Sequence, residues 1–353
     1  MRRLPLAIVA GLLLQSAPTH AASKDLRDWY AACDNIRTCA ALAVTDKSLG
    51  SYLRIDRDGA PNAAPRVTIV VAADKELAFD MAFDDPAIPG LPKGPFKVAN
   101  DDTTKIEIAA GNVETMLAAL RKAQKLTITY TDAANKKPDE RTIAEISLSG
   151  AAAAMLWIDE QQKRLGTVTA LARRGDKPAS SVPAPPPLPV VRAPKAGNTA
   201  IPKTFPDTLM ARAKEVCGEE EDKPKAGDIN RLSGNLLLFW IGCPDLSGAY
   251  NFYSAPLMAA PNTLQSAKLV RFPPPPDVKP NQESAVLTNP HFDEKTMTVS
   301  EFSKGRGIGD CGSSTDWTWD GKAFRVTRHA IMPVCGAVMF DEWPPLYRAT
   351  VKN

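Results

Sequence analysis

Short runs of alternating or branched apolar residues dominate the first half of the chain and predict strands. They are SYLRIDR (51–57), RVTIVVA (66–72), ELAFDMA (76–82), KIEIAA (105–110), KLTITY (125–130) and TIAEISL (142–148). Two other segments have apolar residues at helical spacing and predict helices over 112–123 and 149–166. In the second helix, Asp159–Lys163 and Glu160–Arg164 have the i,i+4 spacing of ion pairs, and Gly166 is suited to end the helix.

The second half opens with a predicted helix over 206–218 and continues as a series of strands. The strand-forming runs are NLLLFWIGC (235–243), AYNFYSAPLM (249–258), SAKLVRF (266–272), KTMTVSEF (295–302), TDWTW (315–319), KAFRVTRHAIM (322–332) and LYRATV (346–351). Asp320 and Gly321 separate two of these runs and tolerate the positive φ of a two-residue hairpin turn. Together the elements predict an α+β, β-rich fold of mainly antiparallel sheet with a few packed helices.

A proline-rich stretch divides the chain. Residues 176–204 contain eight prolines and no aromatic residue, a composition typical of an extended, semi-rigid spacer. The length of the chain is also typical of two domains. We therefore expect an N-terminal domain over 22–175 with two helices, and a C-terminal domain over 205–353 that begins with a helix.

The first 21 residues have the pattern of a cleaved export signal. Arg2 and Arg3 precede a short apolar run, and Thr19 and Ala21 are small residues at the two positions before the expected cut. The apolar run is shorter than the roughly 20 residues that a membrane-spanning helix needs. The sequence therefore predicts export, to the periplasm of a bacterium.

Six cysteines remain after this cleavage. An even number of cysteines in an oxidising compartment predicts disulfides, although six cysteines allow 15 complete pairings. The simplest hypothesis pairs neighbours along the chain: Cys33 with Cys39, Cys217 with Cys243, and Cys311 with Cys335.

Charge and composition exclude several classes of function. The net charge is +3, of which Arg2 and Arg3 contribute two, so the mature chain lacks the basic character of a nucleic-acid-binding protein. The mature chain has two histidines, His291 and His329, and contains no H-E-x-x-H motif, so no metal site is expected.

The segment GRGIGDCGSSTDWTWDG (305–321) contains the spacing G-x-G-x-x-G, but a dinucleotide site needs a strand before it and a helix after it. Here polar residues precede the glycines and strand signals follow them, so no cofactor is expected. Cys311 could act as a nucleophile with His291 or His329 as its base, but a disulfide to Cys335 would prevent this.

Three carboxylates in the same region raise the possibility of glycan hydrolysis. Asp310, Asp316 and Asp320 are close in sequence to Trp317 and Trp319, and glycosidases use paired carboxylates. The two tryptophans are two residues apart and therefore face the same side of a strand, which is more often core than a sugar platform.

Binding is the simpler hypothesis for this region. Arg306 lies among glycines, where its guanidinium could hold a carboxylate or phosphate. Tyr250 lies in the aromatic run AYNFYS, where it would share one side of a strand with Phe252. Arg306, Asp310, Trp317 and Tyr250 are therefore the candidate binding residues.

Five segments resemble a known family. They are DWYAACDNIRTCAAL, SLSGAAAAMLWIDEQQKRLG, CPDLSGAYNFYS, GRGIGDCGSSTDWTWDGKAF and VCGAVMFDEWPPLYRATV, and they are similar to the bacterial family called domain of unknown function 1176. The opening W…CDN…C is also similar to the invasion-associated locus B proteins over the first domain. The resemblance implies an exported envelope protein and brings no catalytic residue, cofactor or ligand.

The sequence thus favours a non-enzymatic periplasmic protein that recognises a protein or a glycan of the cell envelope. Two alternatives stay open. One is an inhibitor of a lysozyme-like or toxic enzyme, and the other is an envelope glycan hydrolase that uses the carboxylates of the 310–320 region.

Overall fold

The structure is a computed structural model that describes residues 21–45, 50–72, 79–87, 98–100, 103–130, 142–218, 222–276, 278 and 282–353. Nearly all of the expected export signal, residues 1–20, lies outside these ranges, as do residues 76–78 of one predicted strand. Within the described ranges, no helix combines the length and the apolar character that crossing a bilayer requires.

The N-terminal part forms two antiparallel sheets and two helices. The larger sheet has the strand order β1-β2-β3-β4-β5-β8-β7, and the smaller has the order β10-β9-β6. The bounds are β1 (Ala22–Leu26), β2 (Trp29–Cys33), β3 (Cys39–Ala43), β4 (Tyr52–Arg57), β5 (Arg66–Val71), β6 (Phe79–Phe83), β7 (Val98–Asn100), β8 (Thr103–Glu107), α1 (Val113–Lys122), β9 (Lys125–Tyr130), β10 (Thr142–Ser147) and α2 (Ala151–Gln161).

The C-terminal part forms two five-stranded sheets, β12-β13-β14-β15 with β16 paired to β14, and β17-β18-β19-β20-β21. Its elements are α3 (Asp207–Met210), α4 (Ala213–Cys217), β12 (Lys225–Arg231), β13 (Leu237–Cys243), β14 (Tyr253–Ala259), β15 (Lys268–Leu269), β16 (Leu287–Thr288), β17 (His291–Asp293), β18 (Thr298–Lys304), β19 (Gly312–Trp319), β20 (Phe324–Met332), β21 (Pro345–Arg348) and β22 (Thr350–Lys352). The β-rich, largely antiparallel architecture expected from the sequence is therefore confirmed.

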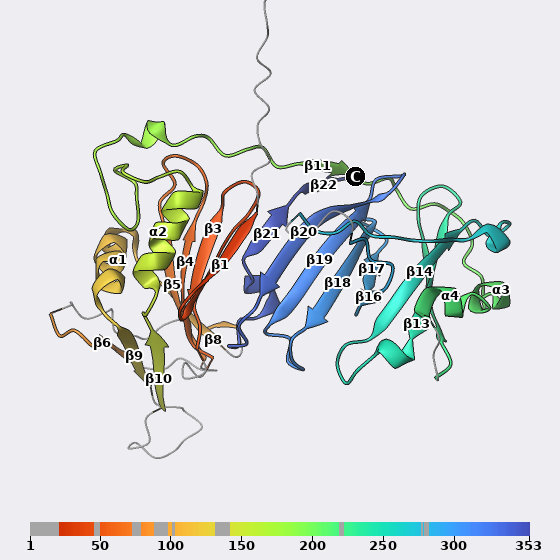
Figure 1. Cartoon of the computed structure of the whole chain (residues 1–353), viewed down its shortest axis with the longest axis horizontal. Helices are drawn as coiled ribbons and strands as arrows, with labels where there is room; N and C mark the ends of the chain where they lie inside the picture. Colours follow the sequence, from red (N-terminus) through yellow and green to blue (C-terminus); the bar gives the residue numbers. More distant parts are fainter. Residues whose placement is uncertain are drawn as a thin grey trace, which may run out of the picture.

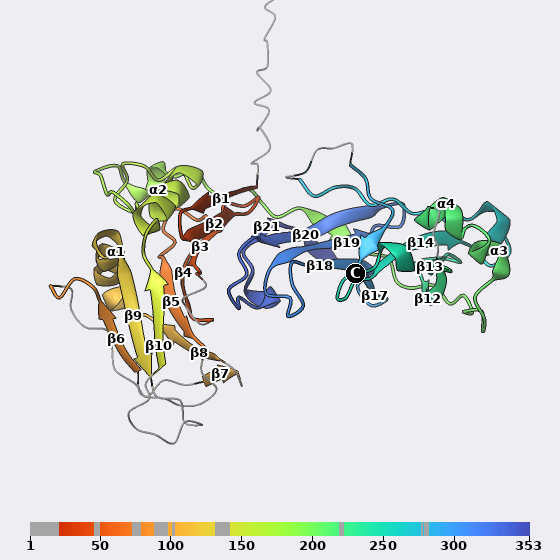
Figure 2. The ribbon, with the colours of Figure 1, turned by 60° about the horizontal axis from the view of Figure 1, so that its bottom comes forward.

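These elements stack as layers along the long axis of the molecule (Figure 1). Helices α1 and α2 cover one face of the seven-stranded sheet, the sheet β17–β21 stands in the middle, and the sheet β12–β16 is followed by α3 and α4. The rotated view in Figure 2 shows β5, β9 and β10 running steeply across the direction of β18, β19 and β20.

Strands β2 and β3 are buried along their whole length because both faces of their sheet are covered. Alternate residues point to opposite faces of a sheet. Trp29, Ala31 and Ala41 accordingly pack with α1 and α2. The intervening residues, such as Tyr30 and Leu42, pack against side chains of the central sheet and the segment that follows it. This second cluster joins the two halves of the chain in one apolar contact.

The hairpin loop between β2 and β3 adds a polar clamp to this contact. The Asp34 carboxylate is fully buried and accepts a hydrogen bond from Nε of Arg348 at 2.6 Å. Asn35 pairs with the backbone of Arg348 in both directions, at 2.9 and 3.0 Å. The Cys33–Cys39 disulfide closes this loop.

The proline-rich segment 176–204 is extended and follows the surface of both halves. Arg37 donates hydrogen bonds to the carbonyl groups of Pro183, at 2.8 Å, and Ala184. Further on, β11 (Val190–Arg192) pairs in parallel with β22 near the C-terminus. The segment includes one short 3-10 turn, Ala179–Ser181, and contacts both halves of the chain. Its role as a spacer between two domains stays a prediction.

All three cysteine pairs expected from the sequence form disulfides: Cys33–Cys39, Cys217–Cys243 and Cys311–Cys335. Disulfides are typical of proteins outside the cytoplasm, where thiols are oxidised. The chain is therefore suited to an extracytoplasmic compartment.

The second predicted helix ends five residues early, and its expected ion pairs are wrong. Helix α2 stops at Gln161, and Lys163 then adopts a positive φ of 60°. Asp159 instead accepts hydrogen bonds from the backbone of Leu171 and Ala172, both at 2.8 Å. Arg164 turns inward, is fully buried, and bonds to the carbonyl group of Pro61 at 2.7 Å.

Two other local predictions need correction. The helix expected over 206–218 is broken into α3 and α4, because Arg212 leaves helical ψ and its guanidinium bonds to Glu215 and to the carbonyl group of Ala267. The hairpin after Trp319 exists, but four residues connect its strands, since Trp319 pairs with Phe324. The Asp320 carboxylate caps this loop through the amides of Lys322 and Ala323, both at 2.8 Å.

Replacing Arg164 tests the buried network of the N-terminal part. The substitution Arg164→Met leaves the carbonyl groups of Ala60 and Pro61 without their donors. We expect the free energy of unfolding in urea to fall by about 3 kcal/mol, because buried polar groups are then unsatisfied. The matched variant Arg173→Met changes an exposed arginine and should alter the value by less than about 0.5 kcal/mol. Equal losses in the two variants would contradict this role.

A second substitution tests the clamp between the halves. Burial raises the pKa of Asp34, and the Arg348 guanidinium opposes this shift. Arg348→Met removes the opposing charge, so we expect a loss of about 2 kcal/mol at neutral pH, a value reduced because Arg348 is partly exposed. A carboxyl group whose pKa is raised by folding destabilises the folded protein as the pH rises through that pKa. The loss of unfolding free energy in Arg348→Met should therefore shrink as the pH falls and Asp34 becomes protonated.

Urea titrations of Arg348→Met from pH 4 to pH 8 measure this trend. Adding Asp34→Asn to the variant removes the uncompensated charge and should restore part of the stability at pH 7. A deficit that is independent of pH would show that the clamp is not electrostatic.

Candidate functional site

The structure brings together three of the four candidate residues. Arg306 Nε donates to Oδ1 of Asp310 at 2.7 Å, and Oδ2 of Asp310 accepts from the amide of Ala337 at 2.6 Å. The hydroxyl group of Tyr250 reaches the carbonyl group of Gly305 at 3.4 Å. Tyr250, Arg306 and Asp310 therefore lie on adjoining loops at one end of the C-terminal sheets.

Asp310 is a structural element of its loop. Its side chain is fully buried, and the hydrogen bond from Arg306 lowers its pKa. The adjoining turn is specific for glycine: Gly312 has a φ of 133°, and a Cβ atom there would lie 2.0 Å from the carbonyl oxygen of Ser303. The glycine-rich segment is thus a rigid turn beside the Cys311–Cys335 disulfide, as the sequence favoured.

The carboxylates of the 310–320 region do not converge. Asp310 and Asp320 lie beyond opposite ends of β19, an eight-residue strand that is about 25 Å long. The Asp320 carboxylate binds its own turn and Arg325. Asp316 lies between them on the strand. Asp310 and Asp320 therefore lie too far apart to flank one glycosidic bond, which needs carboxylates about 5–10 Å apart.

Trp317 lies in the core. It is 3% exposed, its Nε1 donates to the carbonyl group of Pro273 at 2.8 Å, and its ring lies 5.1 Å from that of Phe272. Trp319 is buried in the same cluster, so the predicted sharing of one strand face is confirmed. The expectation that Trp317 presents its ring to a ligand does not fit this placement.

The aromatic run near Tyr250 lies in a loop rather than on a strand, because β14 begins only at Tyr253. Asn289 holds this loop: its Oδ1 accepts from the amide of Phe252 at 3.0 Å, and its Nδ2 donates to the carbonyl group of Phe302 at 2.8 Å. The Phe252 side chain is 59% exposed. The loop therefore presents a large apolar ring to solvent from a fixed backbone.

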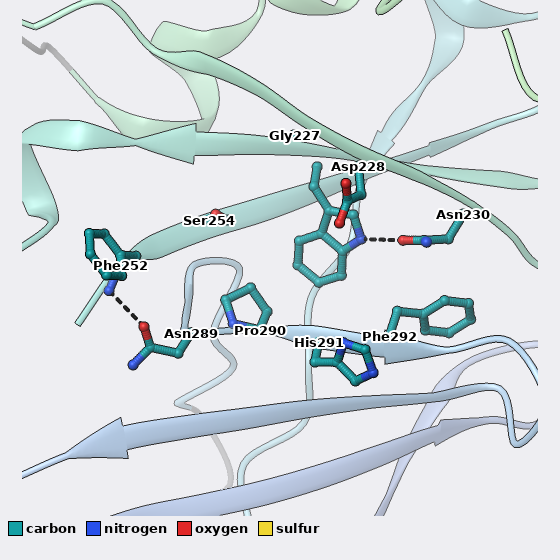
Figure 3. Close-up of a pocket in the computed structure, with 10 residues that line it drawn as sticks. Gly227, Asp228, Asn230, Phe252, Ser254, Asn289, Pro290, His291 and Phe292 are labelled. Carbon is teal, nitrogen blue, oxygen red and sulfur yellow. Dashed lines mark hydrogen bonds between the residues drawn. The ribbon is translucent and has the colours of Figure 1, made fainter. Parts of the chain in front are cut away.

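Phe252 lies at one end of a groove between the two C-terminal sheets (Figure 3). The groove has a volume of about 500 Å³. One wall comes from β12 to β14 and the other from the segment that leads into β17. Its lining combines aromatic rings and prolyl carbon with hydrogen-bonding groups: Gly227, Asp228, Asn230, Trp240, Phe252, Ser254, Asn289, Pro290, His291 and Phe292.

The backbone of β12 is shaped to form this wall. The pairing of β12 with β13 shifts register between Ala226 and Ile229. Within this bulge, a Cβ atom on Gly227 would lie 3.0 Å from the carbonyl oxygen of Trp240. The indole Nε1 of Trp240 donates to Oδ1 of Asn230 at 2.9 Å and thereby fixes both side chains.

Asp228, Asn230 and Trp240 were not among the residues predicted from the sequence. The segment KAGDINR of β12 is polar and contains glycine, so it lacks the pattern of a strand. Trp240 lies in a continuous apolar run that reads as fully buried. The indole N–H of a buried tryptophan usually needs a hydrogen-bond acceptor. The tryptophan within this run was therefore the one signal for a polar partner nearby.

A second polar cluster resembles catalytic machinery but is closed to substrate. Oγ1 of Thr315 and Nδ1 of His329 are hydrogen-bonded at 2.9 Å, and burial raises the pKa of nearby Glu301. Thr315 is 4% exposed and His329 is 3% exposed. The hydrogen bond between Thr315 and His329 therefore stabilises the interior of the C-terminal part.

Cys311 is bonded to Cys335 and does not provide a thiolate. Asp310, Cys311 and Cys335 have ligand-type atoms within 4.8 Å of one another, but both sulfur atoms are committed to the disulfide. The described part of the chain has no free cysteine.

Alkylation tests this assignment directly. The mature protein, denatured in iodoacetamide without a reductant, should gain no mass, because every sulfur atom is bonded to another. After reduction the same treatment should add six alkyl groups. A modified Cys311 before reduction would revive the nucleophile hypothesis.

Comparisons with known proteins agree with the sequence resemblance. The family model "Protein of unknown function (DUF1176)" matches residues 23–350. The uncharacterized protein YpfG of Escherichia coli (strain K12) is 27% identical over 363 residues, which cover 97% of this chain and 96% of YpfG. The crystal structure of invasion associated protein b from Bartonella henselae is 16% identical, covers 40% of this chain and 99% of its own, and has a TM-score of 0.31. The chain belongs to the DUF1176 family.

Proposed function

We propose that this protein is a periplasmic binding protein that recognises a glycan of the cell envelope in the groove between its C-terminal sheets. The observation that carries the proposal is the lining of the groove. Ligand sites combine apolar and aromatic walls with a few fixed polar groups, and this groove has Phe252 and Trp240 beside Asp228, Asn230 and His291.

The chemistry of these residues suits a sugar. The negative face of an aromatic ring attracts the polarised C–H groups on one face of a pyranose. Carboxylate, amide and imidazole groups on the facing walls can exchange hydrogen bonds with its hydroxyl groups. Phe252 is suited to the stacking role because its ring is exposed while its backbone is held by Asn289.

The three disulfides support the location. They match an oxidising compartment, and the expected export signal would deliver the chain to the periplasm. The envelope glycans are available there as ligands.

Titration of the mature protein with soluble peptidoglycan fragments tests the proposal. We expect saturable binding, and we expect Phe252→Ala to weaken it about tenfold, equivalent to about 1.4 kcal/mol for one stacked ring. Asp228→Asn should weaken it by a similar factor through a lost charged hydrogen bond.

Ile308→Ala is the matched control, because it removes an apolar side chain that is 66% exposed and lies outside the groove. Its affinity should equal that of the wild type. Absence of binding to any fragment, or equal losses in Phe252→Ala and Ile308→Ala, would refute a glycan site in the groove. Capture of a purified lysozyme without glycan binding would favour the inhibitor hypothesis.

A further inference from the structure

A row of polar residues crosses the central sheet from edge to edge. Strand pairing places His291 opposite Ser300, Ser300 opposite Asp316, Asp316 opposite Arg328, and Arg328 opposite Arg348. Directly paired residues of neighbouring antiparallel strands point to the same face. All five residues line one cavity of about 620 Å³, which the proline-rich segment borders at Leu188.

The outer end of the row is neutralised within the protein. Arg348 bonds to the buried carboxylate of Asp34 at 2.6 Å and to the hydroxyl group of Thr38 at 3.0 Å. Its positive charge is therefore matched by the clamp from the N-terminal part.

The centre of the row is different. Asp316 and Arg328 are cross-strand neighbours, yet their side chains form no ion pair within 4.0 Å and no hydrogen bond with any residue that the structure describes. The guanidinium of Arg328 lies 4.8 Å from the ring centroid of Phe340, and its Nη1 atom is buried without an acceptor in the described ranges. Burial lowers the pKa of Arg328, and the charge of nearby Asp316 opposes this shift without a direct ion pair.

This arrangement costs stability in the free protein. A buried guanidinium nitrogen without an acceptor carries a desolvation penalty. Charged side chains held apart in a cavity at such a cost are typical of binding sites.

The pair of opposite charges selects the class of ligand. A simple anion would be attracted by Arg328 and repelled by Asp316. A simple cation would be attracted by Asp316 and repelled by Arg328. A neutral sugar would leave both charges without a counter-charge. A molecule with an ammonium and a carboxylate group on neighbouring atoms matches both.

We propose that the cavity between Asp316 and Arg328 binds a free α-amino acid, with its carboxylate on Arg328 and its ammonium group on Asp316. The hydroxyl group of Ser300 lies beside Asp316 in the row and can add a hydrogen bond. The volume leaves room for a side chain. This site is separate from the glycan groove, although His291 borders both cavities.

Isothermal titration of the mature protein with free alanine, glutamine and phenylalanine tests the proposal. At least one should bind, and blocking either charge of the tightest binder, as its N-acetyl or its amide derivative, should weaken binding at least tenfold. Inorganic phosphate and glucose should bind at least tenfold more weakly. The weakest affinity that would support the proposal is a Kd of about 10 mM. Absence of binding of all three amino acids at this concentration, or equal binding of the blocked forms, would overturn the proposal.

Two variants assign the charges. Asp316→Asn should bind the free amino acid more weakly than the wild type does, because the partner of the ammonium group is gone. The variant should therefore bind the free amino acid and its N-acetyl derivative with equal affinity. Arg328→Gln should behave in the same way toward the amide derivative. Circular dichroism checks that both variants fold, and unchanged preferences in folded variants would overturn the proposal.

Phe252→Ala separates the two sites. It should weaken glycan binding and leave the amino-acid affinity within twofold of the wild type, because Phe252 does not line this cavity. Loss of amino-acid binding in Phe252→Ala would contradict two separate sites, whereas failure of glycan binding alone leaves the amino-acid result to stand on its own.

Discussion

Burial of both faces of the β2–β3 hairpin is the constraint on which the arrangement of the molecule depends. One face packs on α1 and α2, and the other packs on the central sheet. Each strand is therefore apolar at every position, with alanine at half of the ten positions, which allows close approach on both sides. Because the disulfide-closed loop of this hairpin also carries Asp34, the same element supplies the apolar contact and the charge that fixes Arg348. The position of the central sheet is thus set by a short N-terminal hairpin.

The two faces of the central sheet have different surroundings: one is covered by an apolar core, and the other carries a row of polar residues. On one face Val299, Trp317 and Phe324 form a closed apolar core with residues of the sheet β12–β16. On the other face, apolar side chains such as Ala330 and Met332 contact the N-terminal hairpin, but only at one end of the strands. The row through Asp316 and Arg328 lies beyond that contact, where the layers leave a cavity. A strand can present charge there without a desolvation cost as large as that of a closed core.

Features with local physical causes were predictable from the sequence. Alternating runs marked the strands, the two-residue spacing of Trp317 and Trp319 marked one buried face, and an even number of exported cysteines marked three disulfides. The failures have tertiary causes. Arg164 reads as a helix-surface residue, yet it is drawn inward because the backbone carbonyl groups of residues 58–61 need donors. The groove and the charged row depend on strand register between segments distant in sequence, which periodicity within each strand does not determine.

His291 connects the two proposed sites because it lines both cavities from the short strand β17. The residues on either side of His291 have different partners. Asn289 accepts a hydrogen bond from the amide of Phe252 in the aromatic loop, whereas the Asp293 carboxylate accepts one from the amide of Lys295 in the turn before β18. A ligand that shifts this imidazole in one cavity therefore changes the wall of the other. Any such coupling is reciprocal, since binding free energies around a closed cycle must agree. The pairing of all three residues of β17 with β18 restrains the backbone of His291 and limits how large that coupling can be.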